Sequence, residues 1–227
     1  MKYCFFLFSF LMCLQTVLGQ SNKAESLDSL YREDQLYVSV TYNALINLTE
    51  DMTQNSFSPG LHLGFMRDFP MNKARNFAIG LGLGYSYNRF NQNLKIDTSS
   101  QPIYEIVEGG NFNKNNFSQH LIEFPLEFRW RTSNSETYKF WRIYSGIKAG
   151  YVFASKSVFE DANERLYSKN LEGLNAWQYG LTLSIGYNTW NGYVYYGLNS
   201  VFDSVSTINN QSIDFNSLKI GLIFYIL

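Results

Sequence analysis

The sequence has little charge, little proline and no long apolar run beyond its first twenty residues. Charged residues make up 16% of its 227 residues, against roughly 25% in an average soluble domain. The formal net charge of −1 offers no basic surface of the kind that binds nucleic acid. Four prolines and 45% hydrophobic residues argue against a disordered chain. The mean hydropathy is −0.20, and no run of 18 or more apolar residues follows the N-terminus. Because each membrane helix needs a run of about that length, a bundle of membrane helices is excluded.

Cysteine is confined to the N-terminus, where Cys4 and Cys13 lie in an apolar stretch that follows Lys2. A positive charge, a short apolar core and a small residue at Gly19 predict a cleaved signal peptide over 1–19. The remaining chain then has no cysteine, which excludes disulfides, zinc–thiolate sites and cysteine nucleophiles. An exported chain without disulfides is typical of a bacterial envelope.

Aromatic residues are abundant, at 18%, and they alternate with small polar residues. After a polar segment over 20–34, expected to be periplasmic, apolar side chains recur at every second position. From Trp177 to Tyr187, odd positions are mostly aromatic or aliphatic and even positions are Gln, Gly, Thr, Ser and Gly. Eight such segments are predicted, over 36–46, 60–70, 77–90, 119–130, 141–155, 176–187, 192–202 and 217–227. Their length suits tilted membrane strands.

The connections between these segments alternate in length. Those over 47–59, 91–118, 156–175 and 203–216 are long and polar, whereas those over 71–76, 131–140 and 188–191 are short. Long loops at one end and short turns at the other are typical of bacterial outer-membrane barrels. We therefore predict an all-β fold over 35–227, an eight-stranded antiparallel transmembrane β-barrel with up-and-down meander topology, located in the cell outer membrane.

A soluble barrel of the lipocalin type is the main alternative. Its polar face would meet water and would be rich in lysine, glutamate and aspartate. Here the polar face is mostly Gly, Ser, Thr and Ala, which suits the narrow lumen of eight strands. Aromatic residues also gather at the strand ends, as expected at the two membrane interfaces. These interfacial residues are Trp130, Trp141, Trp177, Tyr187 and Trp190.

Parity predicts that six charged side chains point into the lumen: Asp68, Glu123, Glu127, Arg129, Lys148 and Lys219. Buried charges persist when they are paired, so we interpret them as an internal network of salt bridges. A proton or ion path through the lumen is the alternative. Glu123 and Glu127 are about 13 Å apart at ~3.3 Å per residue, too far for a two-carboxylate hydrolytic pair.

The chain has only two histidines, His62 and His120. Ser118, His120 and Glu123 contain the side chains of a hydrolytic triad, which would have to converge in space. Parity places Ser118 and His120 on one face and Glu123 on the other. We therefore predict no catalytic residue, no metal site and no cofactor.

Four segments resemble the PorT-type outer-membrane β-barrels (porin family) of Bacteroidota. They are Phe65–Pro70, Ala78–Tyr85, Leu121–Arg131 and Lys139–Lys148. The third of these segments carries a Glu-Phe-Pro sequence at 123–125. The resemblance extends over 36–227 and implies an outer-membrane barrel. The family's named member belongs to the type IX protein-secretion and gliding apparatus, so the resemblance also implies an accessory or assembly role in protein secretion.

The expected partners are outer-membrane lipid and, through the loops at 91–118 and 156–175, envelope or secretion proteins. Tyr104, Phe112, Phe117 and Phe159 are the candidate anchors, because aromatic side chains dominate many interfaces. The segment over 20–34 is a second candidate contact. The alternative functions are a surface-exposed barrel for ligand binding or envelope structure, a small porin, and a lipid-modifying enzyme.

Overall fold

The computed structural model describes residues 34–54, 56–98, 101–109, 111–132, 140–203 and 205–226. These residues lie within one compact unit, Arg32–Leu227. The expected signal peptide over 1–19, and the polar segment over 20–34 up to residue 33, lie outside the described residues. No helix in the described ranges is long and apolar enough to cross a membrane.

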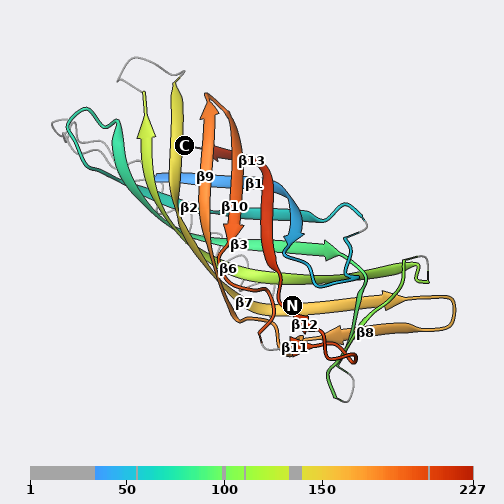
Figure 1. Cartoon of the computed structure of the whole chain (residues 1–227). Helices are drawn as coiled ribbons and strands as arrows, with labels where there is room; N and C mark the ends of the chain where they lie inside the picture. Colours follow the sequence, from blue (N-terminus) through green and yellow to red (C-terminus); the bar gives the residue numbers. More distant parts are fainter. Residues whose placement is uncertain are drawn as a thin grey trace, which may run out of the picture. The chain divides into compact units, whose positions relative to one another are not determined.

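Eight long strands form a closed antiparallel barrel (Figure 1). They are β1 (Asp34–Ile46), β2 (Pro59–Pro70), β3 (Phe77–Asn91), β6 (Lys114–Arg131), β7 (Trp141–Glu160), β9 (Trp177–Tyr187), β10 (Trp190–Gly197) and β13 (Asn216–Ile226). Each pairs with the next in this order, and β13 pairs with β1 from Leu36↔Ile226 to Ile46↔Asn216. The predicted eight-stranded meander is confirmed.

The long connections contain short strands of their own. A hairpin of β4 (Leu94–Asp97) and β5 (Ile103–Ile106) lies between β3 and β6. Strand β8 (Arg165–Lys169) pairs with the far part of β7, where Figure 1 shows the two strands running side by side. A small hairpin of β11 (Val205–Ser206) and β12 (Ser212–Ile213) precedes β13. We call this the loop end of the barrel, and the end with short connections the turn end.

The observed strands differ from the expected ones mainly at the loop end. Strands β6 and β7 are 18 and 20 residues long, because they continue as a paired ribbon beyond the segments that alternate most clearly. Strand β10 ends at Gly197 instead of 202. The side chain of Asn199 accepts a hydrogen bond from the Tyr179 N–H and donates one to the Trp177 carbonyl, both at 2.8 Å. These bonds tie the chain after β10 to β9, and the ladder stops.

Side chains alternate between an apolar outer face and a polar lumen. In β9, Trp177 and Tyr179 point outward, whereas Gln178 and Thr182 are buried. Strand β10, whose sequence has aromatic residues on both faces, turns Tyr193 and Tyr195 into the lumen. Tyr195 fits because Gly180 lies beside it: a Cβ at Gly180 would be 2.3 Å from the ring.

The predicted interfacial aromatics lie at the two ends of this outer face. At the turn end, Trp141 contacts Tyr187 with ring centroids 5.3 Å apart, and Trp190 contacts Phe224 at 5.4 Å. Trp130 is opposite Phe77 at the same end. Trp177 lies toward the loop end, where its ring is 5.1 Å from Tyr151.

The loop end is closed by a hydrophobic cluster that we call the loop-end core. Phe117 is 0% exposed and stacks on Phe90 at 4.9 Å, while Phe202 meets it edge-on at 5.6 Å. The cluster contains residues of β1 and the connection after it, of β3 to β6, of the connection after β8, and of the chain between β10 and β13, including β11 and β12. Its buried residues are Leu45, Met52, Phe90, Leu94, Ile96, Tyr104, Phe117, Leu171, Val201, Phe202, Val205, Ile213 and Phe215.

Candidate functional site

All six charged side chains that parity directs into the lumen are 5% exposed or less in the structure. Five of them, Asp68, Glu123, Glu127, Arg129 and Lys148, divide into two ion-paired groups at different heights. The sixth, Lys219, makes no ion pair with any described residue.

The group nearer the turn end is centred on Arg129. Its guanidinium forms ion pairs with Asp68, at 2.5 Å, and with Glu127, at 3.0 Å. It also donates a hydrogen bond to Gln35 at 2.9 Å. Arg131 approaches the second oxygen of Asp68 at 3.3 Å. The Arg129 side chain fits against β3 because Gly80 has no side chain. A Cβ at this position would lie 2.7 Å from the Arg129 Nε.

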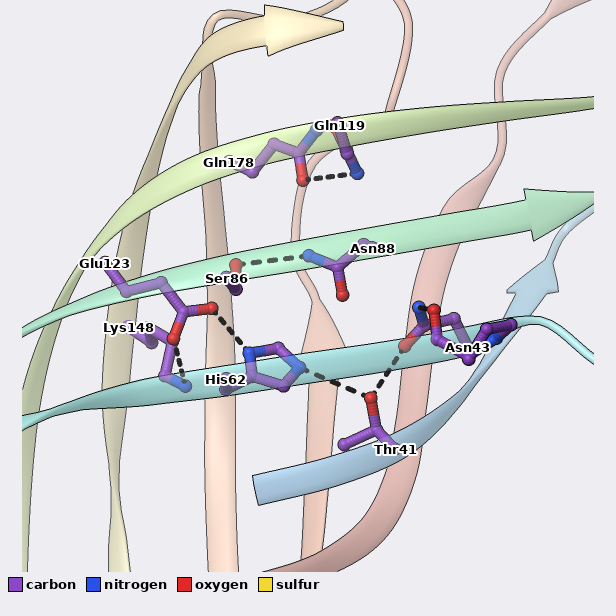
Figure 2. A network of polar contacts seen from close by, with 10 residues as sticks. Thr41, Asn43, His62, Ser86, Asn88, Gln119, Glu123, Lys148 and Gln178 are labelled. Carbon is purple, nitrogen blue, oxygen red and sulfur yellow. Dashed lines mark hydrogen bonds and ion pairs between the residues drawn. The ribbon is translucent and has the colours of Figure 1, made fainter. Parts of the chain in front are cut away.

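The group in the middle of the barrel is centred on Glu123 (Figure 2). One carboxylate oxygen lies 3.0 Å from Lys148 Nζ and the other 2.9 Å from His62 Nδ1. His62 and Glu123 belong to β2 and β6, with β3 between them. They reach each other because β3 presents only small residues here, Gly84 opposite Glu123 and Ser86 opposite His62.

Thr41, His62 and Glu123 form a line of hydroxyl, imidazole and carboxylate. The Thr41 Oγ1 to His62 Nε2 distance is 3.3 Å, so the order of groups is that of a nucleophilic hydrolase. However, the Thr41 hydroxyl donates to Asn43 Oδ1 at 2.8 Å, and Asn43 is fixed by donating to the Pro59 carbonyl at 3.0 Å. The Thr41 proton is therefore directed away from His62. The arrangement is that of a satisfied polar network in a packed lumen.

Tyrosine rings fill the space between and beside the charged groups. Lys148 lies over the Tyr193 ring at 5.1 Å, and Lys219 lies over Tyr195 at 4.6 Å. Arg129 stacks on Tyr144 at 4.5 Å. The face of an aromatic ring stabilises a cation, so Lys219 has a partner although it has no carboxylate.

Several lumenal residues were absent from the sequence prediction, notably His62, Arg131 and the tyrosines. His62 shares the parity of Asp68 on β2, so the pattern that placed Asp68 in the lumen also places His62 there. Arg131 lies one residue beyond the predicted end of its strand, at 130, so the predicted lumenal face did not include it.

Ser118, His120 and Glu123 do not converge. His120 lies on the outer face, where its Nδ1 is 2.7 Å from the Tyr85 hydroxyl and its ring is 5.1 Å from Tyr87. Ser118 is on the same outer face, whereas Glu123 is in the lumen with His62 and Lys148.

The aromatic residues expected to anchor a partner are mostly buried. Tyr104, Phe117 and Phe159 are 4%, 0% and 2% exposed, and only Phe112 is partly exposed. The first two belong to the loop-end core. The expectation that Tyr104, Phe117 and Phe159 present their rings to a partner is therefore corrected, whereas that for Phe112 stays a prediction. Phe117 packs inside the loop end because β6 continues far enough for its alternation to turn this residue inward.

Three titratable groups at the loop end have shifted pKa values, one through burial and two through hydrogen bonds. Burial raises the pKa of Tyr104 to about 12, and nearby Glu172 adds to this effect. The Tyr104 hydroxyl donates to the Glu172 carbonyl. A hydrogen bond to Glu164, 2.5 Å away, raises the pKa of Lys95. The backbone N–H groups of Asn163 and Glu164 lower the pKa of Asp161.

Among the described residues, no group of three or more His, Cys, Asp or Glu side chains is arranged to hold a metal ion. No curated protein matches the chain. The chain also matches a solved structure, that of Ail, the attachment invasion locus protein of Yersinia pestis. It is 11% identical, the alignment covers 84% of this chain and 97% of that chain, and the TM-score is 0.33, which carries no functional argument.

Residues 19–203, most of the chain, match the outer membrane protein beta-barrel domain. This match agrees with the closed eight-stranded barrel, its apolar outer face and its aromatic ends. The chain therefore belongs to the outer membrane protein beta-barrel domain family, whose members reside in the outer membrane.

Proposed function

We propose that this protein is a non-conducting, non-catalytic barrel that presents a folded loop end to other envelope proteins, as an accessory component of protein secretion. The filling of its interior is the observation that carries the proposal. The Arg129 group, the Glu123 group and the loop-end core occupy successive levels of the lumen. An eight-stranded barrel has room for little more than its own side chains.

The absence of catalysis in this proposal is supported by the hydrogen bonds of the lumen. The Thr41 hydroxyl is used by Asn43, and Glu123 is shared between His62 and Lys148. A general base must be within hydrogen-bond reach of the proton that it removes. The buried position of all these groups also leaves a substrate no surface on which to bind.

Exposed apolar residues at the loop end support contact with a protein. Ile103 on β5 and Ile208 between β11 and β12 are 44% and 58% exposed. The two hairpins adjoin, because the Ile208 N–H donates to the Tyr104 carbonyl at 2.9 Å. We place the partner contact on this pair. The choice of secretion as the task is supported by the resemblance to PorT-type barrels, in particular the strand over 121–131.

The secreted proteome of a deletion strain tests the task, with the wild type and an Ile103→Ser/Ile208→Ser variant supplied in trans. We expect cargo with a C-terminal sorting domain to accumulate inside the deletion strain. The wild type should restore export and the double variant should not. Glu108→Gln, an exposed substitution in the same hairpin connection, is the matched control. Unchanged export in the deletion strain would remove the secretion role.

Planar-bilayer recording tests the closed interior independently. Pure refolded protein should give no steady ohmic steps. Large, regular conductance steps would contradict the proposal and favour a small porin. Unchanged lipid profiles on deletion are also expected, because deletion of a lipid-modifying enzyme would remove the modified lipid from the profile.

A further inference from the structure

Four side chains form a row across the outer face of the barrel near the loop end. Arg89 on β3 is directly opposite Ser118 on β6. Ser118 is opposite Lys156 on β7, and Lys156 is opposite Lys169 on β8. Directly paired residues of antiparallel strands point to the same face. Their neighbours Phe90 and Phe117 point inward into the loop-end core, so this row points outward.

The height of the row places it at the membrane surface. Strand β3 begins at Phe77, at the level of the turn-end aromatic residues, where Phe77 is opposite Trp130. From Phe77 to Tyr87 it extends about 34 Å at ~3.4 Å per residue. A tilt of about 40–45° converts this to a height of roughly 25 Å, the thickness of the apolar band of such barrels. Tyr87 and His120 thus mark the loop-end interface, and Arg89 is the first outward residue of β3 above it.

The cations of this row have no carboxylate partner among the described residues. Arg89 donates to Asn91 Oδ1 at 3.1 Å, and Lys169 lies 5.5 Å from the Tyr167 ring. Lys156 and Lys169 are direct cross-strand neighbours, and like charges in that position destabilise a sheet. A bound anion between them would remove the repulsion.

Two buried polar side chains in the same place also have no hydrogen-bond partner. Ser118 Oγ is between Arg89 and Lys156, and Asn116 Nδ2 is in the next outward row of β6. Both residues are at least nine-tenths buried, at 0% and 4% exposed. A hydroxyl and an amide are hydrogen-bond donors. Donors and cations together fit an oxygen-rich anion.

We propose that Arg89, Ser118, Lys156 and Lys169, with Asn116, bind a phosphate group of a phosphorylated glycolipid in the outer leaflet. The location selects a lipid as its source, since the row begins where the apolar band ends. The aromatic group directly below it, Tyr85, Tyr87, His120 and Phe153, then packs against the sugars and upper acyl chains of the same lipid.

Native mass spectrometry of the refolded full chain in detergent tests this site. The probes are a bis-phosphorylated lipid A and the same lipid with its phosphates removed. Lys156→Gln/Lys169→Gln should weaken binding of the phosphorylated lipid by about tenfold or more, and Ser118→Ala by a few-fold. Lys73→Gln, an exposed lysine at the turn end, should leave binding unchanged. Equal binding of the two lipids, or unchanged binding in the double variant, would overturn the proposal.

Stability measurements separate a binding defect from a folding defect. Without lipid, Lys156→Gln/Lys169→Gln should unfold at the same temperature as the wild type or higher, because it removes a like-charge pair. With phosphorylated lipid, the wild type should gain more stability than the double variant, because ligand stabilisation follows affinity. Inorganic phosphate at millimolar concentration is the third probe. If it stabilises the wild type as well as the lipid does, the ligand is a free anion and the lipid assignment is wrong.

Discussion

Replacing Glu123 by glutamine tests how far the lumenal ion pairs stabilise the barrel. The substitution keeps the side-chain volume and removes the charge that holds Lys148 and His62, at 3.0 and 2.9 Å. Hydrogen bonds to charged groups contribute about 1.5–3 kcal/mol each. Breaking a buried pair on one side costs about 3–5 kcal/mol, because the remaining charge stays buried without its partner. We expect a loss of this size, since Lys148 is only 5% exposed.

Urea unfolding of the barrel in lipid vesicles, followed by tryptophan fluorescence and by the gel shift of folded protein, measures this loss. Glu123→Gln/Lys148→Met, which removes the orphaned ammonium, should recover most of it. The exposed Glu108→Gln should change the unfolding free energy by less than about 0.5 kcal/mol. The reasoning fails if Glu123→Gln is as mild as that control, or if the double variant is as unstable as the single one.

Three further outcomes are expected. Phe117→Ala should cost about 3–5 kcal/mol as a core truncation and make the loop end sensitive to protease on intact cells, and full protease resistance would contradict it. Gly221→Ala should prevent closure of β1 on β13, because its Cβ would lie 2.0 Å from a backbone oxygen; Gly192→Ala, where the nearest atom is 3.7 Å away, should still give the folded gel band. Asp161, with its lowered pKa, should stabilise the loop end above its unfolded-state pKa and lose that effect as the pH falls through the folded-state value; an ordinary pKa by NMR titration of its carboxyl carbon would refute this.

The strand pattern was predictable because each strand has one face toward an apolar phase and one toward a narrow lumen. That contrast gives a period of two, which placed Asp68, Glu123 and Arg129 on the inner face. The pairing of His62 with Glu123 was not predictable, because it crosses β3 diagonally. It depends on the stagger of the strands and on the small residues at Gly84 and Ser86, which periodicity does not reveal.

The loop-end core was missed because its apolar residues are scattered through polar connections. Leu94 and Ile96 alternate over only four residues of β4, too short a run to separate from chance. Their burial depends on Phe202 and Phe215, more than a hundred residues further along the chain. Sequence periodicity reports on local neighbours and does not report on such distant ones.

The loop-end core also bears on the order in which the protein assembles. It joins Leu45 at the end of β1 to Phe215 just before β13, so it cannot be complete until the first and last strands have met. Contacts so distant along the chain form slowly, because the entropy of closing a long loop is lost before they stabilise anything. Protection of the loop-end hairpins is therefore a late event of biogenesis. The rate at which this protection appears would report when β1 pairs with β13 and closes the barrel.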